Sequence, residues 1–499
     1  MKKEVLLINP PIYFHEGQPH SLDSSVPPLG LMYLASYINK YSDKFHANII
    51  DISAENISLR QVVSHIESAM PFAVGITSMT PQLQGCVELA SAIKNSWVNP
   101  PIFLGGPHVS ADPGFVVRHN KLFDYAITGE AEKTFLQSLH KLSNGYPIQP
   151  IQNAEVILDL DSIPIPTRIN KYTGRDSVIF SRGCPYDCYY CSRPAIDKKV
   201  RYRSPENMLA ELKQCSNKID FQDDTLTLNK DRVIELCQFI IKENMTLDWR
   251  CNTRIDLVDE EILTYMKHAG CTMIHFGIEA GNEHIRKDVV RKGNFTNNEV
   301  YNAIGLCKKI GIETAGYFIL GHPSETKATL NDTRQLIFKS GIDILGLSLP
   351  TPFPGSKLFQ LSGMGTQNID QFAFKLMGEG YAGIYPILFS GNFTRAYLFK
   401  YMQDINRKFY LNYKTLWRRL VKDINSFTRL KKDFLDLISI ICNGISRRKP
   451  YVKKSKKRKR RKEADKKGNT NRLQFETPLR LTSPSSSRSK SPAFFPYPP

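Results

Sequence analysis

The chain has 499 residues, of which 41% are hydrophobic and 23% are charged, and this apolar content excludes disorder over the whole length. The 30 glycines and 30 prolines show no period, which excludes a fibrous protein, and no run of about 18 uncharged apolar residues predicts a membrane-spanning helix. Of the formal net charge of +19, residues 447–499 carry +15, because they hold 18 Lys and Arg against 3 Asp and Glu. Most of the positive charge therefore lies in the C-terminal tail. The net charge of residues 1–446 is small and does not indicate whether they bind nucleic acid or membranes.

Residues 1–145 alternate short apolar runs with amphipathic stretches, which predicts a parallel sheet covered on both faces. The expected strands are Glu4–Asn9, Ala47–Asp51, Ala73–Thr77, Ile102–Gly105 and Tyr125–Thr128. The expected helices are Leu29–Lys40, Leu59–Ala69, Gln82–Lys94 and Ala131–Ser143. Five such strands are typical of a flavodoxin-like doubly wound domain, whose ligands bind outside the carboxyl ends of the strands.

Prolines and turn residues predict a linker over 146–175, and residues 176–358 then resume the alternation. The expected strands are Ser177–Ser181, Lys218–Phe221, Asp248–Asn252, Met273–Ile278, Thr314–Leu320 and Ile344–Ser348. The expected helices are Pro205–Cys215, Asp231–Glu243, Glu260–His268, Asn297–Lys309 and Lys327–Ser340. Six consecutive βα units predict a partial (β/α)6 barrel. We expect a helical segment at 359–446 and a disordered basic tail at 447–499.

Three cysteines, Cys184, Cys188 and Cys191, follow the first predicted barrel strand in the pattern CxxxCxxC. Thiols at this spacing in one short loop can converge on a metal centre, and a 4Fe–4S cluster with only three cysteine ligands keeps one iron open. A structural zinc site needs four ligands, commonly as two close pairs, and no second pair is an obvious partner. Three unrelated buried thiols are the other alternative, and the spacing favours the cluster.

This motif at the opening of a βα barrel resembles the radical S-adenosylmethionine superfamily. The resemblance implies that the open iron binds the amino and carboxylate groups of S-adenosylmethionine. One electron from an external donor of the ferredoxin or flavodoxin type then cleaves a C–S bond and yields a 5′-deoxyadenosyl radical. The resemblance also implies that Tyr190, the aromatic residue before the third cysteine, lies near the adenine.

Later strand ends resemble further segments of the superfamily. By this resemblance Asp223 and Asp224 lie near the cofactor's amino group, although Asp224 also suits a helix N-cap. Arg254 is implied to face the cofactor's carboxylate, and a surface ion pair with a nearby acid is the equal alternative. Glu279, in a segment like GIESG, is implied to accept hydrogen bonds from the ribose. Two segments resemble GxPGET and TPYPGT, the first with Ser324 in place of glycine.

Residues 4–140 resemble the cobalamin-binding domain that precedes many such barrels, through the segments Val26–Leu31, Gly105–Val109 and Gly129–Glu132. The implied cobalamin contacts are Thr77, Ser78, Gly105, Gly106, Gly129 and Glu130. The motif Asp-x-His-x-x-Gly is missing, so a histidine ligand to cobalt is not implied. We interpret His108 as a loop histidine satisfied by local hydrogen bonds. A domain that has kept its shape and lost its ligand is the alternative.

The resemblance as a whole implies a cobalamin-dependent radical enzyme that functionalises an unactivated carbon of a small-molecule, lipid or peptide substrate, most readily by methyl transfer. Oxidative cyclisation or another oxidoreductase outcome on the same scaffold is an alternative, as is a radical enzyme without cobalamin. No residue is predicted to be catalytic. No export signal is predicted, so we expect a cytoplasmic protein with free thiols.

Two other functions are disfavoured by the sequence. A transfer-RNA methylthiotransferase would carry extra cluster cysteines in its N-terminal domain, whereas Cys86 stands alone before Cys184. The charged run 456–462 of the tail has no interleaved aromatic residues, so nucleic-acid binding is not expected. The cysteines outside the motif are expected to be mostly buried core thiols: Cys86, Cys215, Cys237, Cys251, Cys271, Cys307 and Cys442.

Overall fold

The computed structural model describes residues 2–20, 26–169, 172, 174–193, 197–362 and 393–412. The chain divides into one compact unit of residues 1–446 and a second of residues 447–499. All of the described elements belong to the first unit. The predicted tail and Cys442 lie outside the described residues, as does most of the predicted helical segment.

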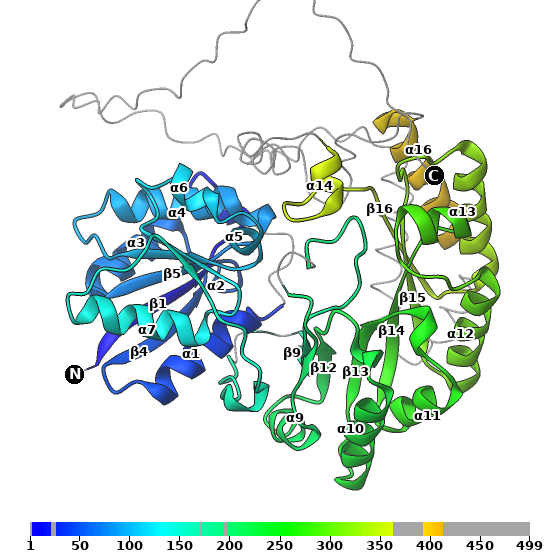
Figure 1. Ribbon diagram of the computed structural model, residues 1–499, viewed down its shortest axis with the longest axis horizontal. Helices are drawn as coiled ribbons and strands as arrows, with labels where there is room; N and C mark the ends of the chain where they lie inside the picture. Colours follow the sequence, from blue (N-terminus) through cyan, green and yellow to red (C-terminus); the bar gives the residue numbers. More distant parts are fainter. Residues whose placement is uncertain are drawn as a thin grey trace, which may run out of the picture. The chain divides into compact units, whose positions relative to one another are not determined.

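The N-terminal part is a six-stranded parallel sheet of order β4-β1-β5-β6-β7-β8 (Figure 1). Its strands are β1 (Lys3–Asn9), β4 (Phe45–Asp51), β5 (Ala73–Thr77), β6 (Ile102–Gly105), β7 (Tyr125–Thr128) and β8 (Ile151–Asn153). A short hairpin joins β2 (Tyr13–His15) and β3 (Gln18–His20). The order of the first five strands is the one found in flavodoxin-like domains, so the predicted fold class of this part is confirmed.

Helices cover both faces of this sheet. They are α1 (Leu29–Tyr41), α2 (Ile52–Glu55), α3 (Leu59–Ala69), α4 (Leu83–Lys94), α5 (Pro107–Ala111), α6 (Gly114–Arg118) and α7 (Ala131–Ser143), with a 3-10 turn η1 (Thr80–Gln82). One apolar core lies between the sheet and α3 and α4, and a second lies between the sheet and α1 and α7. Ser58 and Gln61 form a capping box that fixes the start of α3.

The segment expected as a linker also contributes to this sheet. Strand β8 pairs in parallel with β7, and η2 (Leu160–Ser162) follows it. Strand β8 has only three residues, Ile151–Asn153, and is mostly half-buried. Such a short strand has neither the apolar run nor the alternation that marks the other strands. The surrounding prolines and turn residues therefore led to the prediction of a linker.

The second part is a parallel sheet of order β16-β15-β14-β13-β12-β9, which confirms the predicted six βα units. Its strands are β9 (Asp176–Val178), β12 (Lys218–Phe221), β13 (Asp248–Thr253), β14 (Cys271–Glu279), β15 (Glu313–Ile319) and β16 (Ile344–Ser348). The helices are α9 (Pro205–Leu212), α10 (Lys230–Lys242), α11 (Glu260–His268), α12 (Asn297–Ile310) and α13 (Lys327–Ser340). The short turns are η3 (Leu226–Leu228), η4 (Ile255–Leu257) and the π-helical η5 (Ile285–Val289).

Figure 1 shows α11, α12 and α13 in a row along one side of this sheet, and the apolar core of the barrel fills the space between. Trp249 is a large, fully buried side chain of this core, and its indole N–H donates to the Ala269 carbonyl at 2.8 Å. Helix α14 (Lys357–Leu361) follows the last strand, and α16 (Arg395–Tyr410) packs on the barrel through Leu398 and Ile405. Among the described helices, none is both long enough and apolar enough to cross a membrane.

Strand β9 is shorter than expected because the chain leaves the sheet early. The carboxylate of Asp223, two residues after β12, accepts hydrogen bonds from the backbone N–H groups of Phe180 and Ser181 at 3.0 and 2.6 Å. These donors are thereby withdrawn from the sheet. The chain continues as β10 (Ser181–Arg182), which pairs in antiparallel fashion with β11 (Arg201–Tyr202).

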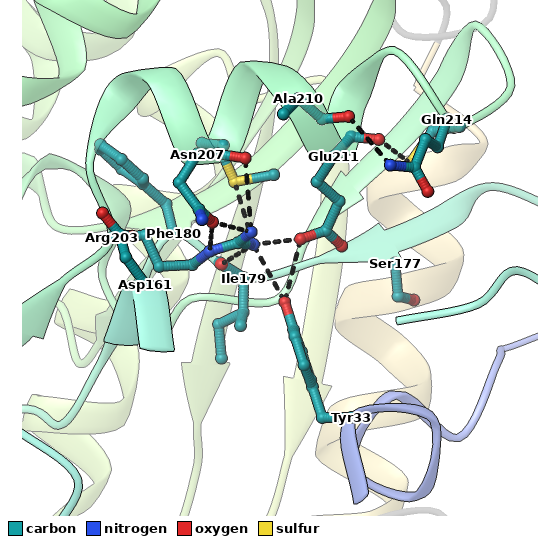
Figure 2. A network of polar contacts seen from close by, with 12 residues as sticks. Tyr33, Asp161, Ser177, Ile179, Phe180, Arg203, Asn207, Ala210, Glu211 and Gln214 are labelled. Atoms are coloured by element: carbon teal, nitrogen blue, oxygen red, sulfur yellow. Dashed lines mark hydrogen bonds and ion pairs between the residues drawn. The ribbon is translucent and has the colours of Figure 1, made fainter. Parts of the chain in front are cut away.

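A buried polar network links α1 of the first part to α9 of the second (Figure 2). The carboxylate of Glu211, fully buried, forms ion pairs with Arg203 and with Arg168 of the segment between the sheets. Tyr33 donates to Glu211 at 3.1 Å and accepts from Arg203 at 3.0 Å. This group, Tyr33, Arg168, Arg203 and Glu211, is called the buried clamp below.

Candidate active site

The three cysteines of the motif lie in the loop between β10 and β11. Cys188 is buried, Cys184 and Cys191 are half-buried, and all three are free thiols. The loop is closed tightly at its base, where the Cys184 N–H donates to the Asp197 carbonyl at 3.3 Å. Gly183 has φ of +94°, and a Cβ there would lie 2.3 Å from the Lys199 carbonyl oxygen, so only glycine suits this turn.

Segments from the far strands of the barrel hold this loop in place. The Tyr189 N–H donates to the Val290 carbonyl at 3.1 Å, and the Leu358 N–H donates to the Tyr189 carbonyl at 2.8 Å. The Tyr189 hydroxyl is 2.8 Å from Nδ1 of His322, which follows β15 and is fully buried. Burial lowers the pKa of His322 to about 4, so its imidazole is neutral near pH 7.

The three thiols are the donor type that a 4Fe–4S cluster takes, but among the described residues no group of three His, Cys, Asp or Glu side chains is arranged to hold a metal ion. Burial raises the pKa of Cys188, and it raises the pKa of Cys191 to about 11. Thiols in this setting ionise only beside a strong positive charge, which an iron cluster supplies when it is bound. Cys188 and Cys191 also line a cavity of about 200 Å³ that opens beside the loop.

Tyr190 and Glu279, predicted to contact the cofactor, lie against each other. The Tyr190 hydroxyl donates to Oε1 of Glu279 at 2.7 Å, and Nζ of Lys292 lies 3.1 Å from the same oxygen. Burial, followed by the charge of Glu279, raises the pKa of Tyr190 well above its ordinary value. Glu279 has φ of +69°, which is unusual for a side chain other than glycine and turns it out of β14.

Lys292 was not predicted from the sequence. Its charge is opposite to that of Glu279, and the attraction raises its pKa although burial opposes this. No sequence pattern pointed to it; Lys292 lies between Arg291 and Gly293, which both have positive φ. Lys292 therefore compensates the charge of a carboxylate that would otherwise be buried alone.

The two aspartates after β12 have different surroundings. Both oxygens of Asp223 are engaged by Phe180 and Ser181, and burial raises its pKa to about 6. Asp224 is partly exposed and forms an ion pair with Arg193 at 2.8 Å. The N-cap of the following turn is Thr225 rather than Asp224. Of the two aspartates, Asp224 is therefore the one that is accessible to a ligand.

Arg254 forms the ion pair that was the alternative to its expected role beside the cofactor. Its guanidinium lies 2.7 Å from Asp256, as the ion-pair alternative expected, but its side chain is only 3% exposed and so is not a surface group. The guanidinium also lies 3.7 Å from the ring centroid of Tyr186 in the cysteine loop. This contact fixes Arg254 directly against the loop that carries the thiols.

A cavity of about 860 Å³ lies at the carboxyl ends of the strands of both sheets. The predicted cobalamin residues that line it are Thr77, Gly105, Gly106, Gly129 and Glu130. From the second part of the chain, the lining includes Arg182, Gly183 and Asp224. The size and the largely apolar interior suit a large organic cofactor.

Ser78 is not among the lining residues. It is fully buried, and its hydroxyl donates to the Gly105 carbonyl at 2.7 Å. Gly106 has φ of +99°, and a Cβ there would lie 2.7 Å from the Ser78 nitrogen. Ser78 therefore shapes the glycine turn that borders the cavity.

Glu130 lines the cavity, but its carboxylate is already committed. It accepts from Arg201 at 2.8 and 2.9 Å and from the Ile157 N–H at 2.9 Å. A second ion pair joins Arg182 to Glu132 at 2.7 Å. With the buried clamp, these pairs bind the first sheet to the second around the cavity.

His108, expected to be a loop histidine, is buried at the start of α5, and its Nδ1 lies 3.0 Å from the Thr80 hydroxyl. The remaining described thiols, Cys86, Cys215, Cys237, Cys251, Cys271 and Cys307, are buried or half-buried. Burial raises the pKa of Cys307 to about 12, as for an inert core thiol.

Comparison with known proteins agrees with this geometry. The profile of the Radical SAM superfamily matches residues 178–337, and that of the B12 binding domain matches residues 20–138. An uncharacterized methyltransferase of Pyrococcus horikoshii is 30% identical over 84% of this chain and 94% of its own. The anaerobic magnesium-protoporphyrin IX monomethyl ester cyclase of Rubrivivax gelatinosus is 27% identical over 84% and 79% of the two chains.

A solved structure has the same fold. The radical S-adenosylmethionine methyltransferase TsrM of Kitasatospora setae, with cobalamin and a [4Fe-4S] cluster bound, superposes with a TM-score of 0.62. It covers 72% of this chain and 74% of its own at 17% identity, which establishes likeness of fold.

The barrel and its cysteine loop define a radical S-adenosylmethionine enzyme. The chain belongs to the radical S-adenosylmethionine superfamily, and to the group of its members that carry a B12-binding domain. The cofactors of that group are a 4Fe–4S cluster, S-adenosylmethionine and cobalamin.

Proposed function

We propose that this enzyme transfers a methyl group to an unactivated carbon of its substrate. The observation that carries the proposal is the cavity of about 860 Å³, because both the B12-binding domain and the radical domain line it. A bound cobalamin supplies a methyl group, and reductive cleavage of S-adenosylmethionine supplies a radical. Of the residues proposed for the cluster and for S-adenosylmethionine, Asp224 alone lines this cavity, and the proposal is that the substrate carbon lies between the two cofactors there.

We assign roles to the chain's own residues as follows. Cys184, Cys188 and Cys191 hold the cluster, and Tyr190 and Glu279 border the adenosyl group. Asp224 and Arg254 are the charged groups proposed for the amino acid portion of the cofactor, and Asp223 positions Asp224 through the turn that it holds. The proposed cobalamin contacts are Thr77, Gly105, Gly106 and Gly129, with Ser78 and Glu130 as positioning residues.

The proposed partners follow from the same chemistry. The cluster needs an external electron donor of the ferredoxin or flavodoxin type. The apolar lining of the cavity suits a small-molecule, lipid or peptide substrate, and nucleic acid is not a proposed partner. A reducing, cytoplasmic compartment suits thiols that must stay free for cluster assembly.

The test of methyl transfer uses the full chain, purified without oxygen and reconstituted with iron, sulfide and cobalamin. We expect corrin absorbance to stay with the protein through gel filtration. We also expect S-adenosylhomocysteine to be released in amounts that depend on the bound corrin. Two results together would contradict the proposal. The corrin would separate from the protein, and the rate of S-adenosylmethionine cleavage would be the same with and without added cobalamin.

Ring closure is the second candidate, because the Rubrivivax gelatinosus cyclase is similar over most of this chain. The two reactions differ in the mass of the product. Methyl transfer adds one methylene unit to the substrate, whereas oxidative cyclisation removes hydrogen and adds no carbon. Mass spectrometry of products made with methyl-labelled S-adenosylmethionine separates them.

A valine at Gly105 should block cobalamin without unfolding the domain. Gly105 ends β6 and lines the cavity, and the atom nearest to an added Cβ is the Ile127 carbonyl oxygen at 3.8 Å. Valine suits a strand, so the fold should tolerate it. Its methyl groups would occupy cofactor space, and overpacking of roughly 1–3 kcal/mol should weaken corrin affinity about tenfold or more.

The affinity is measured by titration of the corrin absorbance, and folding by circular dichroism. Gly305→Ala is the matched control, because Gly305 also has open space for a Cβ but lies on α12, away from the cavity. If Gly105→Val binds the corrin with the wild-type affinity, Gly105 is not part of the cobalamin site.

A further inference from the structure

Three basic side chains surround one carboxylate on the surface of the cysteine loop. Asp187 lies just before Cys188, and Lys357 donates a hydrogen bond to it. The Arg291 and Lys198 side chains lie 3.5 and 3.6 Å from the same carboxylate. The hydrogen bond from Lys357 holds the pKa of Asp187 below its usual range. Three positive charges against one negative charge leave a surplus of two positive charges.

The backbone that carries these cations is tied to the cysteine loop. The Arg291 carbonyl oxygen lies 3.9 Å from Sγ of Cys188. Lys357 opens α14, whose Leu358 N–H donates to the carbonyl of Tyr189 in the loop. The positive surface is therefore held at a fixed place beside the thiols, unlike charges on a loose loop.

A cavity leads from these charges to the thiols. The cavity of about 200 Å³ beside the loop is lined by Asp187, Cys188, Cys191, Lys198, Gly355, Lys357 and Gln360. The side chains of Lys198 and Arg291 are 57% and 55% exposed. Their charges are accessible to a partner molecule, and two of the thiols proposed to hold the cluster line the same cavity as Lys198 and Lys357.

We propose that Lys198, Arg291 and Lys357 form the docking surface for a small acidic electron-transfer protein of the flavodoxin type. The proposal rests on the proposed function only in requiring a reducible cluster in this loop. Carboxylates around the redox centre of such a donor complement the basic surface and bring the two centres together. One electron leaves the reduced flavin and enters the cluster, and no covalent bond forms or breaks.

The test compares two reductants of the reconstituted full chain carrying Lys198→Gln and Arg291→Gln. Reduced flavodoxin needs the docking surface, whereas reduced methyl viologen is a small cation that needs no protein interface. At low salt, we expect cluster reduction by flavodoxin, followed by stopped-flow absorbance, to be about tenfold slower in the double variant. Reduction by methyl viologen should keep its wild-type rate. In about 1 M salt, where the Debye length is about 3 Å, the difference should largely disappear.

The matched control replaces Lys213 and Lys309 with glutamine. These side chains are 50% and 67% exposed and pair with Glu243 and Glu260, so the same number of exposed ion pairs is lost at a distance from the loop. Equal flavodoxin rates in the wild type and the Lys198/Arg291 variant would overturn the proposal. So would an equal loss with both reductants, which would indicate damage to the cluster, or an equal loss in the control. The assay contains no cobalamin and no methyl acceptor, so its outcome is independent of whether methyl transfer occurs.

Discussion

Replacing Cys188 with alanine should abolish reductive cleavage of S-adenosylmethionine, so that 5′-deoxyadenosine stays at background. Cys188 is the central thiol of the loop and is 9% exposed, between the half-buried Cys184 and Cys191. Two thiols cannot hold a cluster that normally relies on at least three protein ligands with one iron left open. The side chain lost is small, so the barrel should fold. Iron content and deoxyadenosine are measured on oxygen-free, reconstituted protein.

Two controls separate cluster loss from general damage. Cys307→Ala removes a fully buried thiol of the barrel core, away from the loop, and should keep both iron and cleavage activity. Deletion of residues 447–499 should spare cleavage as well, since the tail is not part of the proposed chemistry. Wild-type deoxyadenosine formation by Cys188→Ala would refute the assignment of the cluster to this loop.

Replacing Glu211 with glutamine should strongly destabilise the protein. The Glu211 side chain is fully buried and compensates two guanidinium groups, those of Arg203 and Arg168, with side-chain exposures of 3% and 11%. Glutamine keeps the shape but removes the charge, which leaves two buried cations without their anion. Breaking a buried pair in this way costs about 3–5 kcal/mol. We expect a clearly lower midpoint in urea and in thermal unfolding of the full chain.

Two milder variants calibrate that result. Glu243→Gln breaks the exposed pair with Lys213, 2.6 Å long, and should leave the unfolding midpoint nearly unchanged, because solvent screens this pair. Tyr33→Phe removes the hydroxyl that joins α1 to the clamp and should cost about 1–3 kcal/mol, because it leaves buried partners without a hydrogen bond. Equal unfolding midpoints for Glu211→Gln and Glu243→Gln would show that the clamp does not stabilise the fold.

The sequence predicted most of the secondary structure because the apolar runs are bounded by glycine, proline and polar residues. The bounds of β5, β6 and β7 agree with the expectation to the residue. Strand β8 was missed because three residues carry no periodic signal. Strand β9 was expected to run to Ser181 but ends at Val178, since a carboxylate distant in sequence captures the next backbone donors.

The parts of the site whose residues are close in sequence could be predicted. The contacts between residues far apart in sequence could not. The cysteine loop is readable from its spacing alone. Lys292, by contrast, is recognised only when β14 and the turn after it place it against Glu279. Tyr33 and Glu211 are 178 residues apart, and neither stands out in its own helix. Long-range charge compensation of this kind leaves no local pattern to read.

The buried clamp has a consequence for protein engineering. Its members come from α1, from the connecting segment and from the barrel, so each of these three stretches of chain completes the polar contacts of the others. Cutting the chain near residue 160 would leave Arg168 and Glu211 on one fragment and Tyr33 on the other. The N-terminal domain is therefore not an interchangeable module, and a chimera that imports a foreign one must import the matching tyrosine with it.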